Sequence, residues 1–215
     1  MSTLRLGVLA SGSGTNLQAL LDAGARGELG PASIAVVAVN VPGCGAIARA
    51  EAAGVPTIVL PHKDFTERAA FDAALAAKLR ERGVEMVLLA GFMRLLGVDF
   101  LSAFPRGVIN IHPALSPAFP GTHAQKQAFD YGVRIAGCTV HFVDAGVDTG
   151  PIIAQAAVPV LDDDDDEALR KRILAEEHRL YPAVVRALAE DRVVREGRRV
   201  RVLGAPPPAG ALRSL

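Results

Sequence analysis

The stretch LRLGVLASGSGTNLQALLDAGARG, residues 4–27, holds a strand, a glycine-containing loop and a helix in immediate succession. Residues 4–10 form an apolar run typical of a buried strand, and residues 16–27 predict a helix that begins near Asn16 and ends near Gly27. A strand that passes through a short loop straight into a helix is the first half of a βαβ unit. This stretch therefore predicts an α/β fold.

The same alternation continues through the first half of the chain. Apolar strands are predicted at 33–40, 55–61 and 84–90, and helices at 45–54 and 66–83. Strands that alternate with helices pair in parallel through right-handed crossovers, and continuous apolar runs indicate strands covered on both faces. We expect a Rossmann-like, open and mostly parallel twisted sheet with helices on both faces.

The second half predicts a less regular arrangement. Its expected elements are, in order, a strand (107–112), a Pro-rich loop (113–124), a short helix (124–132), two strands (136–143 and 151–160) and a long helix (162–191). The short link between the last two strands favours an antiparallel pair. Pro182 should kink or break the long helix. The acidic run at 162–166 is expected to cap that helix rather than to hold a metal.

These elements predict one domain over residues 1–195. It would comprise a βαβ half (1–105) and a less regular half (106–195), followed at 196–215 by a hairpin-like segment and a Pro-rich tail.

The composition of the chain argues against several classes of protein. Lys plus Arg number 23 and Asp plus Glu also number 23, so the chain lacks the basic excess of a nucleic-acid-binding protein. No apolar run reaches the roughly 20 residues of a membrane span, and the first residues lack the layout of a signal peptide. Cys44 and Cys138 lack metal-ligand spacing and are expected to be free thiols. We expect a cytoplasmic protein that acts on small molecules.

The glycine loop predicts a phosphate site. Gly12 and Gly14 would let backbone approach a ligand, and the helix that follows would offer free N–H groups. Leu17 occupies the third glycine position of a dinucleotide fingerprint, and the lysine of a P-loop is absent. The loop therefore suits one phosphate, with Thr15 and Asn16 adding side-chain hydrogen bonds. The alternative is a tight turn that binds nothing.

A second candidate site lies where the strand at 107–112 ends. Asn110 and His112 are two residues apart, so their side chains share a face. An amide can stabilise an oxyanion, and an imidazole can move a proton near neutral pH. A carboxylate is needed to orient the imidazole and favour its charged form. Asp148 is the first candidate and Asp144 the second, while a purely structural role for His112 is the alternative.

Five stretches, in the same order along the chain, resemble the phosphoribosylglycinamide formyltransferases, a family of folate-dependent formyltransferases. They are SGSGTNLQAL, LAGFMRLL, NIHPALSPAFPGTHA, VHFVDAGVDTGPIIAQ and EEHRLYP. The resemblance covers roughly residues 4–195. It implies the formyltransferase fold and transfer of the formyl group of 10-formyltetrahydrofolate to the amine of phosphoribosylglycinamide.

The resemblance also implies residue roles. Asn110 would hold the formyl oxygen, His112 would donate a proton, and Asp148 would orient and charge the imidazole. The expected binding residues are Gly14, Thr15, Asn16 and Glu177 for the phosphoribosyl substrate, and Arg68, Met93, Arg94, Leu95, Leu96 and Asn110 for the folate. No metal is implied, and the chain would act as a monomer or homodimer.

Several alternatives stay open at this level. Met93, Leu95 and Leu96 could be core residues, Arg68 and Glu177 could be ordinary helix charges, and His141 could line the site or only pack. Ser116 and Ala118 depart from the family loop, and Thr149 requires that its own φ not be positive. A formyltetrahydrofolate hydrolase, another formyltransferase and a non-catalytic folate- or phosphosugar-binding protein remain as alternative functions.

Overall fold

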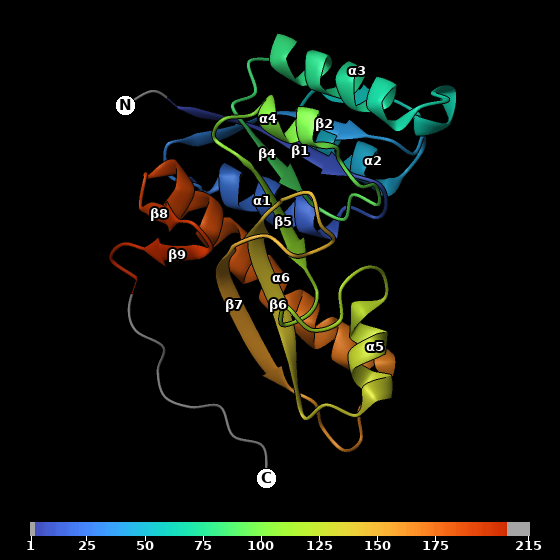
Figure 1. Cartoon of the computed structure of the whole chain (residues 1–215), viewed down its shortest axis with the longest axis vertical. Coiled ribbons are helices and arrows are strands. Elements are labelled where there is room, and N and C mark those ends of the chain that lie inside the picture. Colours follow the sequence, from blue (N-terminus) through green and yellow to red (C-terminus); the bar gives the residue numbers. More distant parts are fainter. Residues whose placement is uncertain (1–2, 206–215) are drawn as a thin grey trace.

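In the computed structural model of the chain, residues 3–205 are described. Their core is a seven-stranded sheet with the order β3-β2-β1-β4-β5-β6-β7 (Figure 1). The strands are β1 (Leu4–Ala10), β2 (Ala32–Val39), β3 (Thr57–Val59), β4 (Met86–Leu89), β5 (Val108–His112), β6 (Ile135–Phe142) and β7 (Ile152–Pro159). The first five pair in parallel, whereas β6 and β7 run antiparallel to their neighbours. The predicted mostly parallel sheet with antiparallel strands in the C-terminal half is confirmed.

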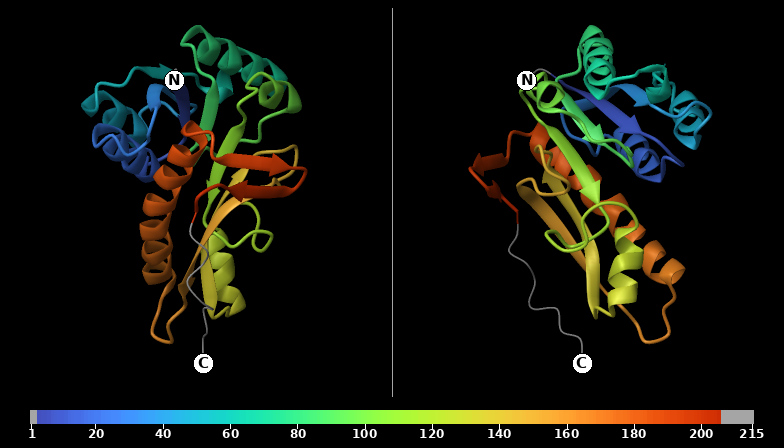
Figure 2. Two further views of the ribbon diagram at one scale, coloured as in Figure 1. Left: turned by 90° about the vertical axis from the view of Figure 1, so that its left-hand side faces the viewer. Right: turned by 45° about the vertical axis from the view of Figure 1, so that its right-hand side comes forward.

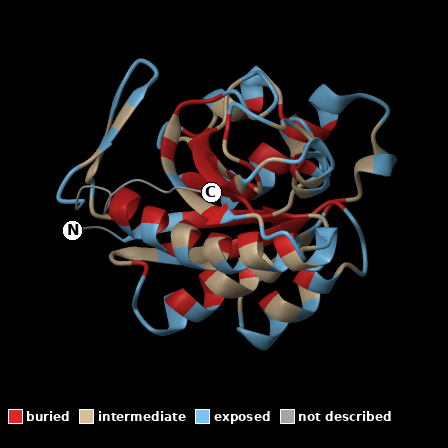
Figure 3. Ribbon diagram, turned by 90° about the horizontal axis from the view of Figure 1, so that it is seen from below, coloured by how far each residue is buried: buried red, intermediate tan, exposed pale blue. Residues whose placement is uncertain are grey.

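Helices cover both faces of the sheet. One apolar cluster joins the sheet to α1 (Thr15–Ala25), α2 (Gly45–Ala52), α5 (Ala124–Tyr131) and α6 (Asp166–Ala189). A second cluster joins the opposite face to α3 (Arg68–Glu81) and α4 (Val98–Ser102). Figure 3 shows the buried residues gathered along the sheet, with exposed residues on the outer sides of the helices.

The strand order places a topological switch point between β1 and β4, the place where open α/β sheets form a ligand-binding crevice. The chain leaves β1 toward β2 and β3, then crosses back to β4 on the other side of β1. The loops after β1 and β4 therefore diverge to opposite sides at the carboxyl edge of the sheet, and open α/β sheets bind ligands at such a point. The carboxyl end of β5 lies next to it. The glycine loop, the loop after β4 and His112 consequently share one edge.

Some predicted elements differ from those observed. The strand expected at 55–61 is only Thr57–Val59, and a short helix α4 and a 3₁₀ turn at His62–Asp64 were not predicted. The break expected at Pro182 does not occur, because α6 continues to Ala189. Tyr181 and Val185 on either side of Pro182 are fully buried, so packing against the sheet outweighs the loss of one hydrogen bond within the helix.

The acidic run at 162–166 acts at the start of α6, as predicted. Asp165 is the N-cap and its side chain accepts a hydrogen bond from the N–H of Ala168 at 2.7 Å. Asp164 instead pairs with Arg172, with 2.7 Å between Oδ1 and Nη2. Among residues 3–205, no group of three or more His, Cys, Asp or Glu side chains is placed to hold a metal ion.

A separate two-stranded hairpin follows α6. It consists of β8 (Val193–Glu196) and β9 (Arg199–Val202) and projects to one side of the main sheet (Figure 2). Arg198 at its turn donates to the carbonyl oxygen of Thr149 at 2.9 Å. The predicted Pro-rich tail lies outside the described residues. None of the helices within residues 3–205 combines the length and apolarity needed to cross a membrane.

Candidate active site

The glycine loop is shaped by the close approach of α2. Gly14 is the N-cap of α1 with φ +74°, and a Cβ at this position would lie 2.9 Å from the Cα of Ala46. Only glycine meets both conditions without strain. Arg49 of α2, which the sequence analysis did not single out, fastens the loop by donating from Nε to the carbonyl of Ser13 at 2.7 Å. The N-terminus of α1 is thus held open toward the carboxyl edge of the sheet.

Asn16 and Glu177 meet across the packed pair α1 and α6. Nδ2 of Asn16 donates to Oε2 of Glu177 at 2.9 Å, while Oδ1 of Asn16 is buried without a partner. Glu177 is 4% exposed, and burial raises the pKa of its carboxyl to about 7 despite the Asn16 hydrogen bond. Lys171, Arg170 and other helix charges are not its partners in the described residues, so Glu177 is not an ordinary helix charge.

Asn110, His112 and Asp148 converge at the carboxyl end of β5. Asp148 lies in the turn between β6 and β7, and its Oδ1 accepts from Nδ2 of Asn110 at 3.3 Å. Its Oδ2 lies 3.4 Å from Nδ1 of His112, whose side chain is almost entirely buried. The three side chains therefore lie within reach of one another beside the crevice.

The surroundings of Asp148 keep its carboxylate charged. Burial by itself would raise the pKa of Asp148, but hydrogen bonds from His141 and from the N–H of Gly121, together with the charges of His112 and His141, lower it. The Gly121 N–H lies 2.8 Å from Oδ2. Asp148 has φ +52°, a left-handed conformation that costs a non-glycine residue energy and is held by its surroundings. Thr149 is not among the residues with positive φ, which satisfies the condition set from its sequence.

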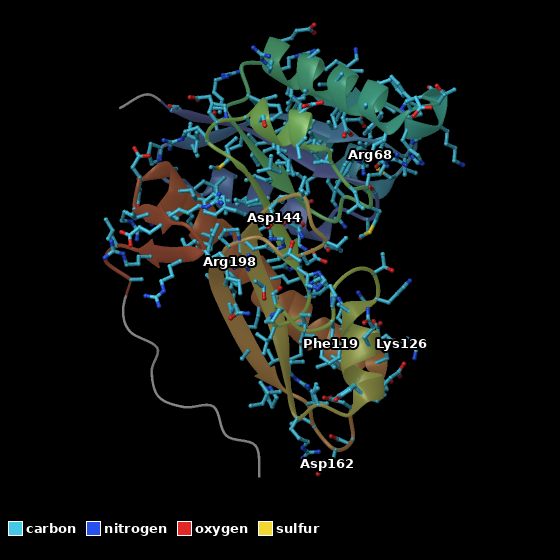
Figure 4. The ribbon with its side chains drawn as sticks, in the orientation of Figure 1. Arg68, Phe119, Lys126, Asp144, Asp162 and Arg198 are labelled. Atoms are coloured by element: carbon cyan, nitrogen blue, oxygen red, sulfur yellow. The ribbon has the colours of Figure 1, made fainter. Side chains whose placement is uncertain are left out.

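The imidazole of His112 is held at both ring nitrogens. Nδ1 faces Asp148, and Nε2 lies 2.9 Å from the carbonyl oxygen of Phe119 in the Pro-rich loop. Phe119 has φ +51° and is labelled in Figure 4 beside α5. Both ring nitrogens of His112 therefore face oxygen atoms, and these two contacts fix the orientation of the ring.

His141 contacts both Asn110 and Asp148 from behind, within the sheet. It pairs with Asn110 across β5 and β6, and its Nε2 lies 3.3 Å from Nδ2 of Asn110 and 3.5 Å from Oδ1 of Asp148. Its Nδ1 contacts the carbonyl of Phe142 at 2.9 Å. His141 is 2% exposed, so it acts as an inner wall that holds both Asn110 and Asp148.

Asp144 does not reach the imidazole of His112. Its Oδ1 accepts from the N–H of Gly146 at 3.1 Å and from the hydroxyl of Thr149 at 2.7 Å. Figure 4 labels Asp144 near the centre of the molecule. Asp144 therefore braces the turn that presents Asp148.

The residues that the resemblance assigns to the folate split into two groups. Met93 and Leu95 are 68% and 54% exposed, so they are not core residues, whereas Leu96 is 7% exposed and packs in the second apolar cluster. Arg94 lies over the ring of Phe71, with 5.5 Å from its guanidinium carbon to the ring centroid. Arg68 is exposed at the start of α3, some way from Asp144 in Figure 4.

A buried network fixes the Pro-rich loop. Thr139 of β6 accepts from the N–H of Ser116 at 3.0 Å and donates to the carbonyl of Ala114 at 2.6 Å. Gln155 of β7 donates to the carbonyl of Ser116 at 3.1 Å. The departure at Ser116 leaves the Ser116 hydroxyl buried without a partner, so its backbone rather than its side chain holds the loop.

The sequence model of the family described as "Formyl transferase" matches residues 4–185. The chain belongs to the formyl transferase family. This confirms the resemblance, and it confirms that the chain is an enzyme of the formyltransferase class. The match includes the glycine loop, β5 and the turn of Asp148.

Relatives and solved structures agree with this membership. Phosphoribosylglycinamide formyltransferase of Mycobacterium tuberculosis (strain ATCC 25618 / H37Rv) is 50% identical over 194 residues, covering 90% of this chain and 89% of the relative. That of Bacillus subtilis (strain 168) is 44% identical over 184 residues, covering 86% and 94%. The crystal structure of glycinamide ribonucleotide transformylase 1 from Symbiobacterium toebii matches with a TM-score of 0.91 and 56% identity, over 94% of each chain.

Other relatives are much longer. "Trifunctional purine biosynthetic protein adenosine-3" of Drosophila melanogaster is 49% identical over 186 residues, which make up 86% of this chain but 14% of that protein. The chain thus spans about one seventh of that relative, and the comparison concerns only the matched part of it.

Proposed function

We propose that the protein transfers the formyl group of 10-formyltetrahydrofolate to the amine of 5-phosphoribosylglycinamide, giving formylglycinamide ribonucleotide and tetrahydrofolate in purine biosynthesis. The observation that carries the proposal is the meeting of Asn110, His112 and Asp148 at the same carboxyl edge of the sheet as the glycine loop. An oxyanion donor, a proton donor and a phosphate-type loop are the three parts that this reaction needs.

The chemical steps follow from these side chains. The substrate amine attacks the formyl carbon, and the carbonyl oxygen becomes an oxyanion that accepts a hydrogen bond from Nδ2 of Asn110. The C–N bond to the folate then breaks as the folate nitrogen takes a proton from the His112 imidazolium. The neutral imidazole that remains takes up the proton that the amine loses, which restores the imidazolium. Asp148 stabilises the charged ring before that transfer.

Binding roles are assigned to the two loops at the crevice. The N-terminal N–H groups of α1, with Gly14, Thr15 and Asn16, would hold the substrate phosphate, and buried Glu177 would accept hydrogen bonds from the ribose. The exposed Met93 and Leu95, with the backbone of residues 93–96, would line the folate, whose glutamate would face Arg68. No step requires a metal.

Every candidate residue comes from one chain, so a monomer and a homodimer would each hold complete sites. Both substrates are small and water-soluble, and we propose a cytoplasmic location. Neither nucleic acid nor membrane is needed as a partner.

The test is a direct assay. Purified protein is mixed with 10-formyltetrahydrofolate and phosphoribosylglycinamide, and tetrahydrofolate release is followed by absorbance. Release that depends on phosphoribosylglycinamide supports the proposal. Release with water alone would instead identify a hydrolase, release with an amino sugar would identify another formyltransferase, and binding of both ligands without release would identify a binding protein.

A further inference from the structure

Ser11, at the end of β1, links the two loops that the proposed function assigns to different substrates. Its backbone N–H donates to the carbonyl of Gly91 at 3.0 Å, and its side-chain Oγ accepts from the N–H of Met93 at 2.9 Å. One residue of the glycine loop therefore binds the start of the loop after β4 at two points.

The Ser11 hydroxyl is itself held in place from β2. Its proton goes to Oδ1 of Asn40 at 2.6 Å, and Asn40 is 3% exposed at the end of that strand. Nδ1 of His62 lies 3.2 Å from Nδ2 of Asn40 and 3.1 Å from the Asn40 carbonyl oxygen. Asn40 and His62 have no part in the proposed chemistry, yet they fix the direction of the Ser11 hydroxyl.

Ser11 holds the start of the loop after β4, and other contacts hold the rest of it. Met93 and Leu95 are exposed, and at its far end the N–H of Gly97 donates to Oδ2 of the buried Asp72 at 2.8 Å. Between these ends Leu96 packs into the core, Phe92 packs against it, and Arg94 lies over the ring of Phe71. Ser11 therefore joins the glycine loop directly to the backbone at Gly91 and Met93.

We propose that Ser11 is a positioning residue that couples the phosphate site to the folate site, so that each substrate strengthens the binding of the other. This inference depends on the proposed function. A ligand at the N-terminus of α1 would order the glycine loop, and through Ser11 it would order the backbone at residues 91–93. The second ligand would then bind to a loop that is already ordered, which gives positive cooperativity.

The experiment measures binding at equilibrium with the full-length chain. The Kd of tetrahydrofolate is determined by calorimetry with and without saturating phosphoribosylglycinamide, and the ratio of the two values is the coupling. For the natural chain we expect tetrahydrofolate to bind about fivefold tighter or more in the presence of the second ligand, the lower end of typical couplings. Ser11→Ala should bring the ratio close to one.

Two variants separate coupling from a general loss of structure. Ser11→Thr keeps the hydroxyl, and a strand end accommodates a β-branched side chain. The ratio for this variant should therefore equal that of the natural chain. Ser33→Ala makes the same kind of change at an exposed position of β2 and should leave the ratio unchanged. A serine needed only for stability would change the unfolding free energy without changing the ratio.

Should Ser11→Ala fail to fold, His62→Ala tests the same link from its outer end and should lower the ratio without abolishing it. A natural chain that binds both ligands with a ratio of one would overturn the inference and leave the proposed function intact. An unchanged ratio in Ser11→Ala would overturn it as well. A chain that binds neither ligand would contradict the proposed function itself.

Discussion

Oδ2 of Asp148 lies 3.4 Å from Nδ1 of His112, on the side of the ring away from the Phe119 carbonyl. The carboxylate approaches from the turn between β6 and β7, whereas the imidazole is fixed at the end of β5. This pairing fixes the orientation of the ring, and the proposed function assigns to Asp148 the stabilisation of the imidazolium that donates the proton.

Replacement of Asp148 by Asn should remove that charge while keeping the size and the tolerance of positive φ. We expect the transfer rate to fall by about 10²–10⁴-fold, the usual contribution of general acid catalysis, with little change in stability. Initial rates of tetrahydrofolate release give the measurement. Asp162→Asn, at an exposed site paired with Arg134 far from β5 (Figure 4), is the matched control.

Asp144 is the alternative candidate for the carboxylate that pairs with His112. If Asp148→Asn kept the rate and Asp144→Asn lost it, the carboxylate role would pass to Asp144. The hydrogen bonds of Asp144 to Gly146 and Thr149 lead us to expect the reverse.

The sequence predicted those strands and loops whose structure is determined by residues close together in the chain. The apolar runs at 4–10 and 84–90 became central strands because burial on both faces requires such runs. The tight loop at Gly14 and the shared strand face of Asn110 and His112 likewise follow from residues that are close together in the sequence. The break considered at Pro182 was wrong, because tertiary packing, which the sequence pattern around it does not report, keeps α6 continuous.

Residue patterns could not predict contacts between segments that lie far apart in the sequence. The pairs Asn16–Glu177 and Ser11–Asn40 depend on how α1, α6 and β2 pack. Glu177 was singled out through the resemblance, and Asn40 and His62 were missed. A polar Asn directly after an apolar run could have drawn attention to Asn40, because a buried amide needs partners.

Glu177 predicts a pH dependence of stability. Its native pKa of about 7 lies above its ordinary value of 4.5 because of burial, so the folded chain holds the proton more tightly than the unfolded chain. The stabilising contribution is therefore complete below pH about 4.5 and is lost as the pH rises toward 7. Glu177→Gln, which is never charged, should be more stable than the natural chain at pH 8 by roughly 3 kcal/mol and about equal to it at pH 4.

Urea unfolding at several pH values measures this difference. Glu176→Gln, the adjacent change on α6 in an exposed pair with Arg179, should alter stability by less than about 1 kcal/mol at either pH. Parallel pH profiles for Glu177→Gln and the natural chain would show that Glu177 is not desolvated in solution.

The two thiols should differ sharply in reactivity. Cys138 in β6 is fully buried, and burial, reinforced by the negative charge of Glu177, raises its pKa to about 12, whereas Cys44 at the start of α2 is half-buried. A thiolate is the reacting species. An aromatic disulfide reagent at pH 8 should label one thiol in the native protein and two after denaturation, and Cys44→Ser should abolish the native reaction. Rapid labelling of both thiols in the native protein would mean that β6 opens readily.

The hydroxyl of Tyr181 ties α6 to the two strands that end at the site. It lies 3.0 Å from the carbonyl oxygen of Leu89 in β4 and 3.3 Å from that of Ile109 in β5, and the side chain is fully buried. Tyr181→Phe would leave a buried carbonyl without its donor, so we expect a loss of about 1–2 kcal/mol in the free energy of unfolding.

The chain has no Trp, so far-UV circular dichroism in urea is the suitable probe. Tyr131→Phe, at a side chain that is 80% exposed, should have no measurable effect. If the two variants were equally stable, the Tyr181 hydroxyl would have no net role in joining α6 to β4 and β5, and strand pairing with the side-chain contacts of His141 and Asp148 would hold Asn110 in place.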